Sequence, residues 1–242
     1  MNKPLQMPMF SPQTEWVPPL RLPDLKEYSE IAIDLETRDP NLMSMGSGSV
    51  RGDGEIVGIA VAVEGWSGYF PIAHEAGGNM DRGLVLDWFE EVLHTDATKI
   101  FHNAMYDVSW IRSMGYQIRG GIIDTLIAAS LIDENRWGYA LNALGREYVG
   151  MGKNEKILQE AAKEWGVNPK SEMWRLPAPL VGEYAEQDAV VTLKLWHALQ
   201  HEISKQDLWD VFNLETELFP CLVDMKFKGV RVDVAKAEAT KA

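Results

Sequence analysis

IAIDLE, at residues 31–36, alternates apolar residues that favour β-structure with two carboxylates. Successive side chains of a strand point to opposite faces, so Asp34 and Glu36 share one face while Ile33 and Leu35 share the other. Two like charges side by side destabilise a strand unless a cation lies between them. The pair therefore indicates a metal site, although a strand that ends and turns towards solvent at residues 37–40 would give the same pattern.

The neighbouring segments divide into a β-rich first part and a helical second part. Strand patterns are carried by residues 31–36, 56–63, 69–72 and 99–102. The first three suggest an antiparallel meander, with a glycine-rich loop before the second strand. Helical periodicity is carried by residues 84–93, 104–114, 180–203 and 208–228, and the last of these ends at Gly229. From residue 122 onward the chain is predicted to be mostly helical, with a polar, proline-broken segment at 152–179. We therefore expect an α/β fold, with a mixed sheet flanked by helices and a helical C-terminal half.

Residues 1–26 are rich in proline and predict an extended lead-in. The first thirty residues lack the apolar core of a signal peptide, and no apolar run approaches the roughly 20 residues that cross a bilayer. The single cysteine, Cys221, has no internal disulfide partner, which fits a reducing cytoplasm. Its apolar surroundings, residues 218–225, predict that it packs in the core.

The composition is strongly acidic, with 36 acidic and 23 basic residues and a formal net charge of −13. This argues against a protein that grips duplex DNA through a basic face. It is compatible with a nuclease whose acids are neutralised by bound cations. The charge predicts weak DNA affinity unless another region holds the substrate.

A second acidic motif, NAMYD, occupies residues 103–107, where a predicted strand ends and a helix begins. Asn103 is a natural N-cap for that helix. Asp107 then falls in the first turn, where a carboxylate gains from the helix dipole. These local effects explain both residues without a functional role, so the motif is weak by itself.

The third motif, YAEQD, occupies residues 184–188 of the long predicted helix. Tyr184 and Asp188 are four residues apart and share one helix face. Val191 and Leu195 continue that stripe, so this face is expected to point inward, where an aspartate needs a partner. The alternative is a surface aspartate beside a packed tyrosine.

Taken together, the carboxylates indicate a site for hard divalent cations such as Mg²⁺ or Mn²⁺. The set comprises Asp34, Glu36, Asp107 and Asp188. A zinc site is disfavoured, because one cysteine and scattered histidines show no ligand spacing. Two divalent ions about 3.5–4 Å apart activate water and stabilise the leaving oxygen of a phosphodiester.

The order Asp-x-Glu, Asn-x3-Asp, Tyr-x3-Asp resembles the proofreading 3′–5′ exonuclease of family A DNA polymerases, the DEDDy class, and most of all its bacteriophage-type members. The likeness runs from about Trp16 to the end of the chain and includes Asp124-Thr125 before a helix. It implies an RNase H-like fold built on a mixed five-stranded sheet. The DEDDh class carries a histidine one residue before the tyrosine position; Glu183 stands there, which disfavours that class.

The resemblance also implies the roles of the site residues. Asp34, Glu36 and Asp188 would hold a first metal, and Asp34 would bridge to a second one. Asp107 would hold that second metal, largely through water. Tyr184 would orient the attacking water, and Glu36 would also contact the terminal 3′-hydroxyl.

Substrate contacts are implied near these carboxylates. Asn103 and Thr37 would position the terminal nucleotide. Tyr106 and Trp110 are aromatic residues that could stack on bases, and the alternative for both is core packing. The family often has an apolar wedge just after its first motif, and Leu42 is the candidate for it here.

Residues 206–242 resemble the opening of the family's polymerase region, although a generic amphipathic helix would look similar. The expected organisation is a lead-in at 1–26, an exonuclease domain at 27–205 and a truncated polymerase start at 206–242. We expect no polymerase activity from this chain. A polymerase region of the parent protein is the expected partner.

Three functions fit these motifs to different degrees. The leading one is a DNA exonuclease that releases nucleoside 5′-monophosphates from single-stranded or frayed 3′ ends. The second is an RNase D-like 3′ exoribonuclease, which uses the same carboxylates; the polymerase-like tail favours DNA. The third is a non-catalytic DNA-end-binding module, against which the presence of all four acids and Tyr184 speaks.

Overall fold

The structure is a computed structural model that describes residue 8, residues 12–152 and residues 155–241. Residues 1–7 and 9–11 of the expected lead-in lie outside the described residues. The described stretch 12–29 contains neither helix nor strand, and the chain enters the sheet at Glu30. Among the described residues, we find no helix with the length and apolar character needed to span a membrane.

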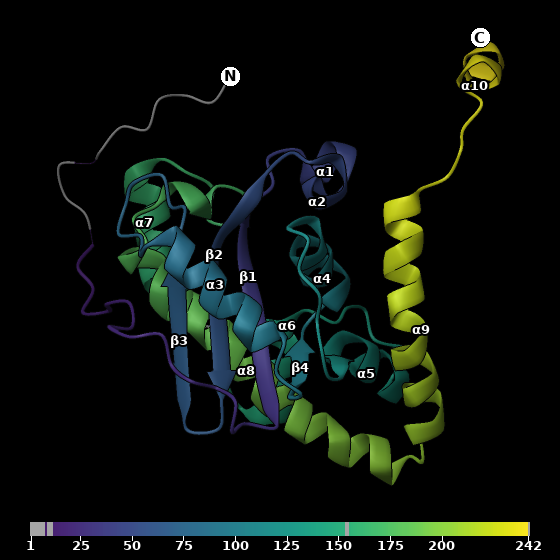
Figure 1. The fold of residues 1–242 in the computed structure, drawn as a ribbon, viewed down its shortest axis with the longest axis horizontal. Coiled ribbons are helices and arrows are strands. Elements are labelled where there is room, and N and C mark those ends of the chain that lie inside the picture. Colours follow the sequence, from purple (N-terminus) through teal and green to yellow (C-terminus); the bar gives the residue numbers. More distant parts are fainter. Residues whose placement is uncertain (1–7, 9–11, 153–154, 242) are drawn as a thin grey trace.

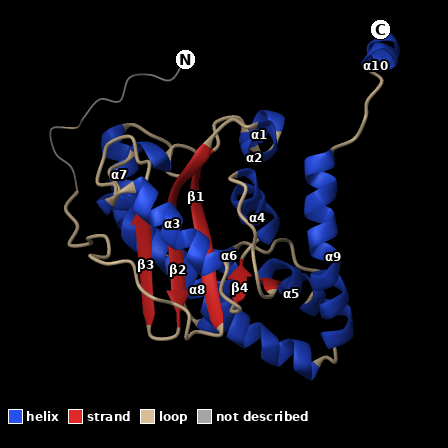
Figure 2. Ribbon diagram, viewed as in Figure 1, coloured by secondary structure: helices blue, strands red, loops and turns tan. Residues whose placement is uncertain are grey.

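A five-stranded mixed sheet forms the centre of the fold (Figure 2). Its strands are β1 (Glu30–Arg38), β2 (Glu55–Val63), β3 (Trp66–Pro71), β4 (Thr98–Phe101) and β5 (Ile122–Asp124). The spatial order is β3-β2-β1-β4-β5, with antiparallel pairing from β1 to β3 and parallel pairing from β1 to β5. This confirms the predicted meander and mixed sheet. From residue 122 onward the described chain is mostly helical, as predicted, except that it starts with β5, a strand of three residues that its pairing with β4 defines.

Helices surround this sheet. They are α1 (Leu42–Met45), α2 (Gly48–Arg51), α3 (Arg82–Leu93), α4 (Ala104–Ser113), α5 (Thr125–Ile132), α6 (Leu141–Leu144), the π-helical turn η1 (Gly145–Val149), α7 (Lys156–Trp165), the 3₁₀ turn η2 (Met173–Arg175), α8 (Pro179–Lys205), α9 (Trp209–Lys228) and α10 (Val234–Lys241). The four predicted helices are confirmed as α3, α4, α8 and α9, and α9 ends at Gly229 with a positive φ of 68°. The predicted loop before β2 contains α1 and α2, and the polar segment contains α7.

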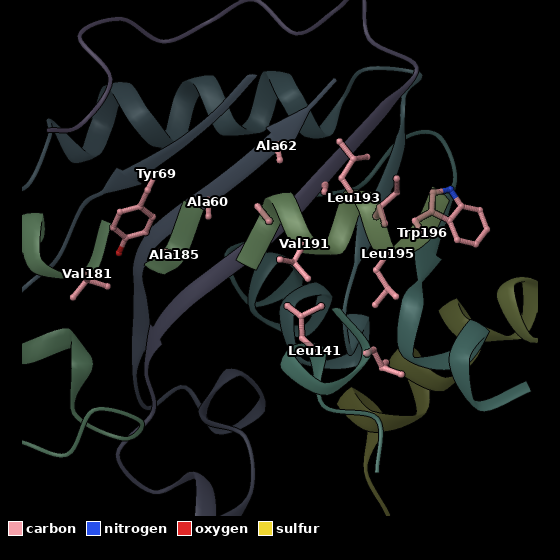
Figure 3. Packing of buried hydrophobic residues seen from close by; sticks show 14 of the residues in the cluster. Ala60, Ala62, Tyr69, Leu141, Val181, Ala185, Val191, Leu193, Leu195 and Trp196 are labelled. Carbon is pink, nitrogen blue, oxygen red and sulfur yellow. The ribbon is translucent and has the colours of Figure 1, made fainter. Parts of the chain in front are cut away.

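Helices α3 and α8 cover opposite faces of the sheet (Figure 1). The β1 residues Ile31, Ile33 and Leu35 pack in the core on the α3 side. Ala32 and the β2 residues opposite it are small, so α8 approaches the other face closely. Figure 3 shows the Tyr69 ring in this second core beside Val181 and Ala185 of α8. The α8 face of β1 is therefore the one that carries Asp34 and Glu36.

Helix α9 packs beside α4 and α5 and buries Phe219 and Val223 on its inner side. Cys221 is exposed, so the prediction that it packs in the core is wrong. The reason is geometric: Cys221 is two residues from each buried neighbour, which is about 200° around the helix. The apolar character of residues 218–225 was correctly seen, but only one side of the helix is covered.

Candidate active site

Strand β1 presents Asp34 and Glu36, both half-buried, towards α8. Asp34 lies opposite Ala60 of β2, and Glu36 lies opposite Gly58. A Cβ atom at residue 58 would lie 2.0 Å from the Tyr69 hydroxyl oxygen, so only glycine fits there. A β-bulge directly after Glu36 then shifts the register of the strand. Small neighbours on β2 thus leave the two carboxylates room on this face.

Helix α8 brings Asp188 to this pair. One oxygen each from Asp34, Glu36 and Asp188 lies within 4.8 Å of the other two, and Asp188 is only 4% exposed. Three carboxylates this close repel one another unless cations are bound between them. An all-oxygen donor set is what Mg²⁺ and Mn²⁺ prefer. The residues present therefore fit a divalent cation.

Asp107 approaches the same strand from the first turn of α4. It is 4% exposed, and its Oδ1 accepts a hydrogen bond from the Leu35 backbone N–H at 3.0 Å. That places its carboxyl group next to β1 between the two acidic positions, outside the close group of three. Burial and then the charge of Asp34 raise the pKa of Asp107 well above its ordinary value of 3.8.

The raised pKa of Asp107 gives a stability prediction for the metal-free chain. The folded state holds this proton more tightly than the unfolded state, so ionisation at neutral pH costs folding free energy. Asp107→Asn keeps an oxygen for the Leu35 N–H and removes the charge. We expect it to raise the melting temperature in chelator at pH 7.

The gain should shrink as the pH falls through the raised pKa of Asp107 and vanish below 3.8, where the aspartate is protonated in both the folded and the unfolded state. Adding Mg²⁺ should reverse the order, because the cation stabilises the parent chain more than the variant. Thermal unfolding across pH, with and without Mg²⁺, measures both effects. A lower melting temperature for Asp107→Asn in chelator at pH 7 would contradict this account.

Tyr184 lies one turn before Asp188 on α8 and is half-buried. Burial, followed by the charges of Asp188 and Glu36, raises the pKa of the Tyr184 phenol. The hydroxyl therefore stays protonated at neutral pH and keeps a hydrogen to donate. The face of α8 that carries these residues continues through Val191 and Leu195, both buried, which confirms that it points inward.

Thr37 and Tyr106 join β1 to α4 at the edge of the carboxylates. The Thr37 hydroxyl and the Tyr106 hydroxyl form a hydrogen bond of 2.6 Å. Burial raises the pKa of Tyr106 to about 12. Trp110, one turn further along α4, is 3% exposed, so the alternative of core packing is the correct one for this residue. Leu42 begins α1, just after β1, and is exposed.

Asn103 has a left-handed backbone, with φ of 67°. Within the described chain its side chain makes no capping bond to α4, so the prediction of an N-cap side chain is wrong. The buried carboxylate of Asp124 has that role instead, accepting from the backbone N–H groups of Asn103 at 2.9 Å and Ala104 at 2.8 Å. It also accepts from Leu126 N–H at 2.9 Å and so caps α5. An aspartate directly before an apolar helix was the sequence signal for this second cap.

Asp124→Ala should destabilise the chain by about 2 kcal/mol, because it leaves backbone N–H groups at two helix starts without their acceptor. Loss of a buried charge offsets part of that cost. Urea unfolding measures the change. Asp81→Ala is the matched control, since the exposed Asp81 caps α3 through one bond from Leu84 N–H. An effect of Asp124→Ala no larger than the control would contradict the double-cap assignment.

Solved structures with this fold include NrnC of Brucella melitensis with bound Mg²⁺. The TM-score is 0.60 at 19% identity, covering 85% of this chain and 89% of that one. RNase D of Escherichia coli, an exoribonuclease, gives a TM-score of 0.55 at 17% identity, covering 85% of this chain and 47% of that one. The chain therefore has the RNase H-like fold that the resemblance implied.

The chain belongs to the 3′–5′ exonuclease family of family A DNA polymerases, whose family model matches residues 22–204. The DNA-directed DNA polymerase of Pseudomonas phage M6 is 37% identical over 242 residues, which is 95% of this chain and 36% of that polymerase. The chain spans about a third of the length of the phage polymerases it matches. The family resemblance drawn from the three acidic motifs is confirmed.

Proposed function

We propose that the protein is a metal-dependent exonuclease that hydrolyses the terminal phosphodiester of single-stranded or frayed DNA 3′ ends. It releases nucleoside 5′-monophosphates and serves as the proofreading part of a DNA polymerase. The observation that carries this proposal is the meeting of Asp34, Glu36 and Asp188 within 4.8 Å, with Asp107 beside the same strand. Membership of a polymerase exonuclease family supports DNA as the substrate.

Two divalent cations, Mg²⁺ or Mn²⁺, are the proposed cofactors. Asp34, Glu36 and Asp188 would hold one of them, and Asp34 with Asp107 would hold the other. Bound there, the cations would supply an activated water and stabilise the leaving oxygen. The pKa of Asp107 is raised by burial and by Asp34, and a cation nearby would favour its ionised form.

The chain's own residues would orient the reacting groups. The protonated Tyr184 hydroxyl would hold the attacking water, and Glu36 would contact the terminal 3′-hydroxyl. Three residues at the edge of the carboxylates would position the terminal nucleotide: Thr37, Asn103 and Tyr106. The exposed Leu42 would act as the wedge that separates the terminal base from its neighbour.

A polymerase region would supply the grip on duplex DNA that a chain of net charge −13 lacks. In this proposal residues 27–205 form the exonuclease unit, and residues 206–242 begin the polymerase region. The outer side of α9 is exposed, and a polymerase region could pack against it.

The function is tested with end-labelled single-stranded DNA, paired duplex, duplex with a mismatched 3′ end, and RNA. Each is incubated with Mg²⁺, Mn²⁺ or chelator. Metal-dependent shortening from DNA 3′ ends supports the proposal, and faster loss of the mismatched end supports proofreading. RNA is included because the exoribonuclease RNase D shares this fold. Faster cleavage of RNA than of DNA would overturn the proposal that DNA is the substrate. Absence of cleavage with Mn²⁺ at high enzyme concentration would favour a non-catalytic DNA-end-binding module.

A further inference from the structure

Trp16 connects the N-terminal segment to the start of α8. Its indole lies against Gly182, where a Cβ atom would come within 2.2 Å of the ring. The ring also meets Tyr69 of β3 at a centroid distance of 6.0 Å. Its Nε1–H donates to Oε1 of Glu186 at 3.0 Å. The close approach to Gly182, the ring contact with Tyr69 and the hydrogen bond to Glu186 together anchor the N-terminal segment to α8 and β3.

Glu186 links three parts of the fold through one carboxylate. The same Oε1 that accepts from Trp16 also accepts from the backbone N–H of Tyr69 at 3.1 Å. The N-terminal segment, strand β3 and helix α8 are therefore held together by one oxygen atom. Movement of α8 along or around its axis would break both bonds.

Tyr69 also links β3, through His74, to Leu176, which lies just before α8. Its hydroxyl lies 2.6 Å from Nε2 of His74, and Nδ1 of His74 lies 3.0 Å from the carbonyl oxygen of Leu176. A carbonyl oxygen only accepts, so Nδ1 carries the hydrogen and Nε2 accepts from the tyrosine. Burial lowers the pKa of His74 to about 4, so this neutral arrangement persists at pH 7.

These contacts hold helix α8, which carries Asp188, against the sheet that carries Glu36. Glu186 is two residues from both Tyr184 and Asp188, so it points to the opposite side of α8, about 200° away. The Tyr69 ring covers Gly58, which lies opposite Glu36 in the sheet. The cluster thus fixes the position of Asp188 on α8 relative to Glu36 on β1.

We propose that Trp16 and Glu186 are positioning residues that set the spacing of the carboxylates for divalent-cation binding. Trp16 lies outside residues 22–204, the part of the chain that the family model matches. The N-terminal segment therefore supports the exonuclease domain from outside the part of the chain that the family model covers. The inference rests on the proposed metal site, whose ligands must be held within about 0.5 Å of the productive geometry.

The test measures Mn²⁺ binding directly, by electron paramagnetic resonance of the free ion, on the full chain. Trp16→Ala and Glu186→Ala should each raise the Mn²⁺ dissociation constant by about tenfold, as loss of outer-shell support typically does. Glu186→Gln keeps the accepting oxygen and should bind within about twofold of the parent chain. Saturating Mn²⁺ should restore kcat in the alanine variants while KM for single-stranded DNA stays unchanged.

Trp209→Ala is the matched control. Trp209 is also half-buried, donates one indole hydrogen bond to Ser204 at 2.9 Å and packs on Trp196 near the far end of α8. We expect it to lower the melting temperature and leave Mn²⁺ affinity unchanged. Parent-like Mn²⁺ affinity in both Trp16→Ala and Glu186→Ala would overturn the positioning role. Absence of Mn²⁺ binding by the parent chain would instead overturn the proposed metal site itself.

Discussion

Asp34→Asn will cleave single-stranded DNA at least about 10³-fold more slowly than the parent chain, a loss of roughly 4 kcal/mol of transition-state stabilisation. Asp34 lies in the close group with Glu36 and Asp188, and its charge raises the pKa of Asp107 more than that of Asp124 does. Removing its charge weakens both proposed cation positions at once. The asparagine has nearly the same shape, so the fold should be retained.

Initial rates with Mg²⁺ and with Mn²⁺ measure this effect, and circular dichroism checks the fold. Asp87→Asn is the control, because it removes one aspartate charge from the exposed side of α3. The control should keep its rate within about twofold. Cleavage by Asp34→Asn at more than a tenth of the parent rate would rule out Asp34 as an essential ligand.

Lys99→Met will destabilise the chain by about 3 kcal/mol and lower the melting temperature by roughly 10 °C. Lys99 is fully buried at the start of β4, with 0% exposure. Its Nζ donates to the carbonyl oxygens of Thr95 at 2.5 Å, Ala97 at 2.9 Å and Arg119 at 2.8 Å, and to the Thr95 hydroxyl at 3.0 Å. Methionine fills similar volume but leaves these acceptors without a donor, and release of the buried charge offsets only part of the cost.

Thermal and urea unfolding measure the loss, with the exposed Lys163→Met as control. That control should change stability by no more than about 0.5 kcal/mol. Lys99 is at the opposite end of β4 from Asn103, so exonuclease activity at low temperature should match the parent chain. Stability of Lys99→Met within 1 kcal/mol of the control would contradict the role given to these hydrogen bonds.

Much of the fold was predictable because long, periodic segments determine their own structure. The alternation at residues 31–36 and the spacing along residues 180–203 correspond to β1 and α8. Strand β5 was missed in the reading of the residues because three residues show no alternation. The exposure of Cys221 was missed because apolar composition does not reveal which side of α9 is covered.

The site was predictable in part. Strand alternation alone placed Asp34 and Glu36 on one face. The approach of Asp107 and Asp188 was expected from the order of motifs that the family shares, since no local pattern joins segments so far apart. The role of Asp124 as a cap of α4 was not predicted, because Asn103 directly precedes that helix and is itself a favoured N-cap residue. In the structure Asn103 takes a left-handed backbone, and Asp124 accepts the hydrogen bond from Ala104 N–H instead. The Trp16 contact had no sequence signal at all.

The bond between Trp16 and Glu186 joins residues 170 positions apart, and Asp107 meets Leu35 across 72 positions. Closing such long loops costs chain entropy, so contacts of this range tend to form late in folding. We therefore expect the carboxylate group to assemble only after α8 has left the ribosome and docked. A nascent chain would carry Asp34 and Glu36 without their third partner, so the proposed nuclease site would be incomplete until synthesis of the domain was finished.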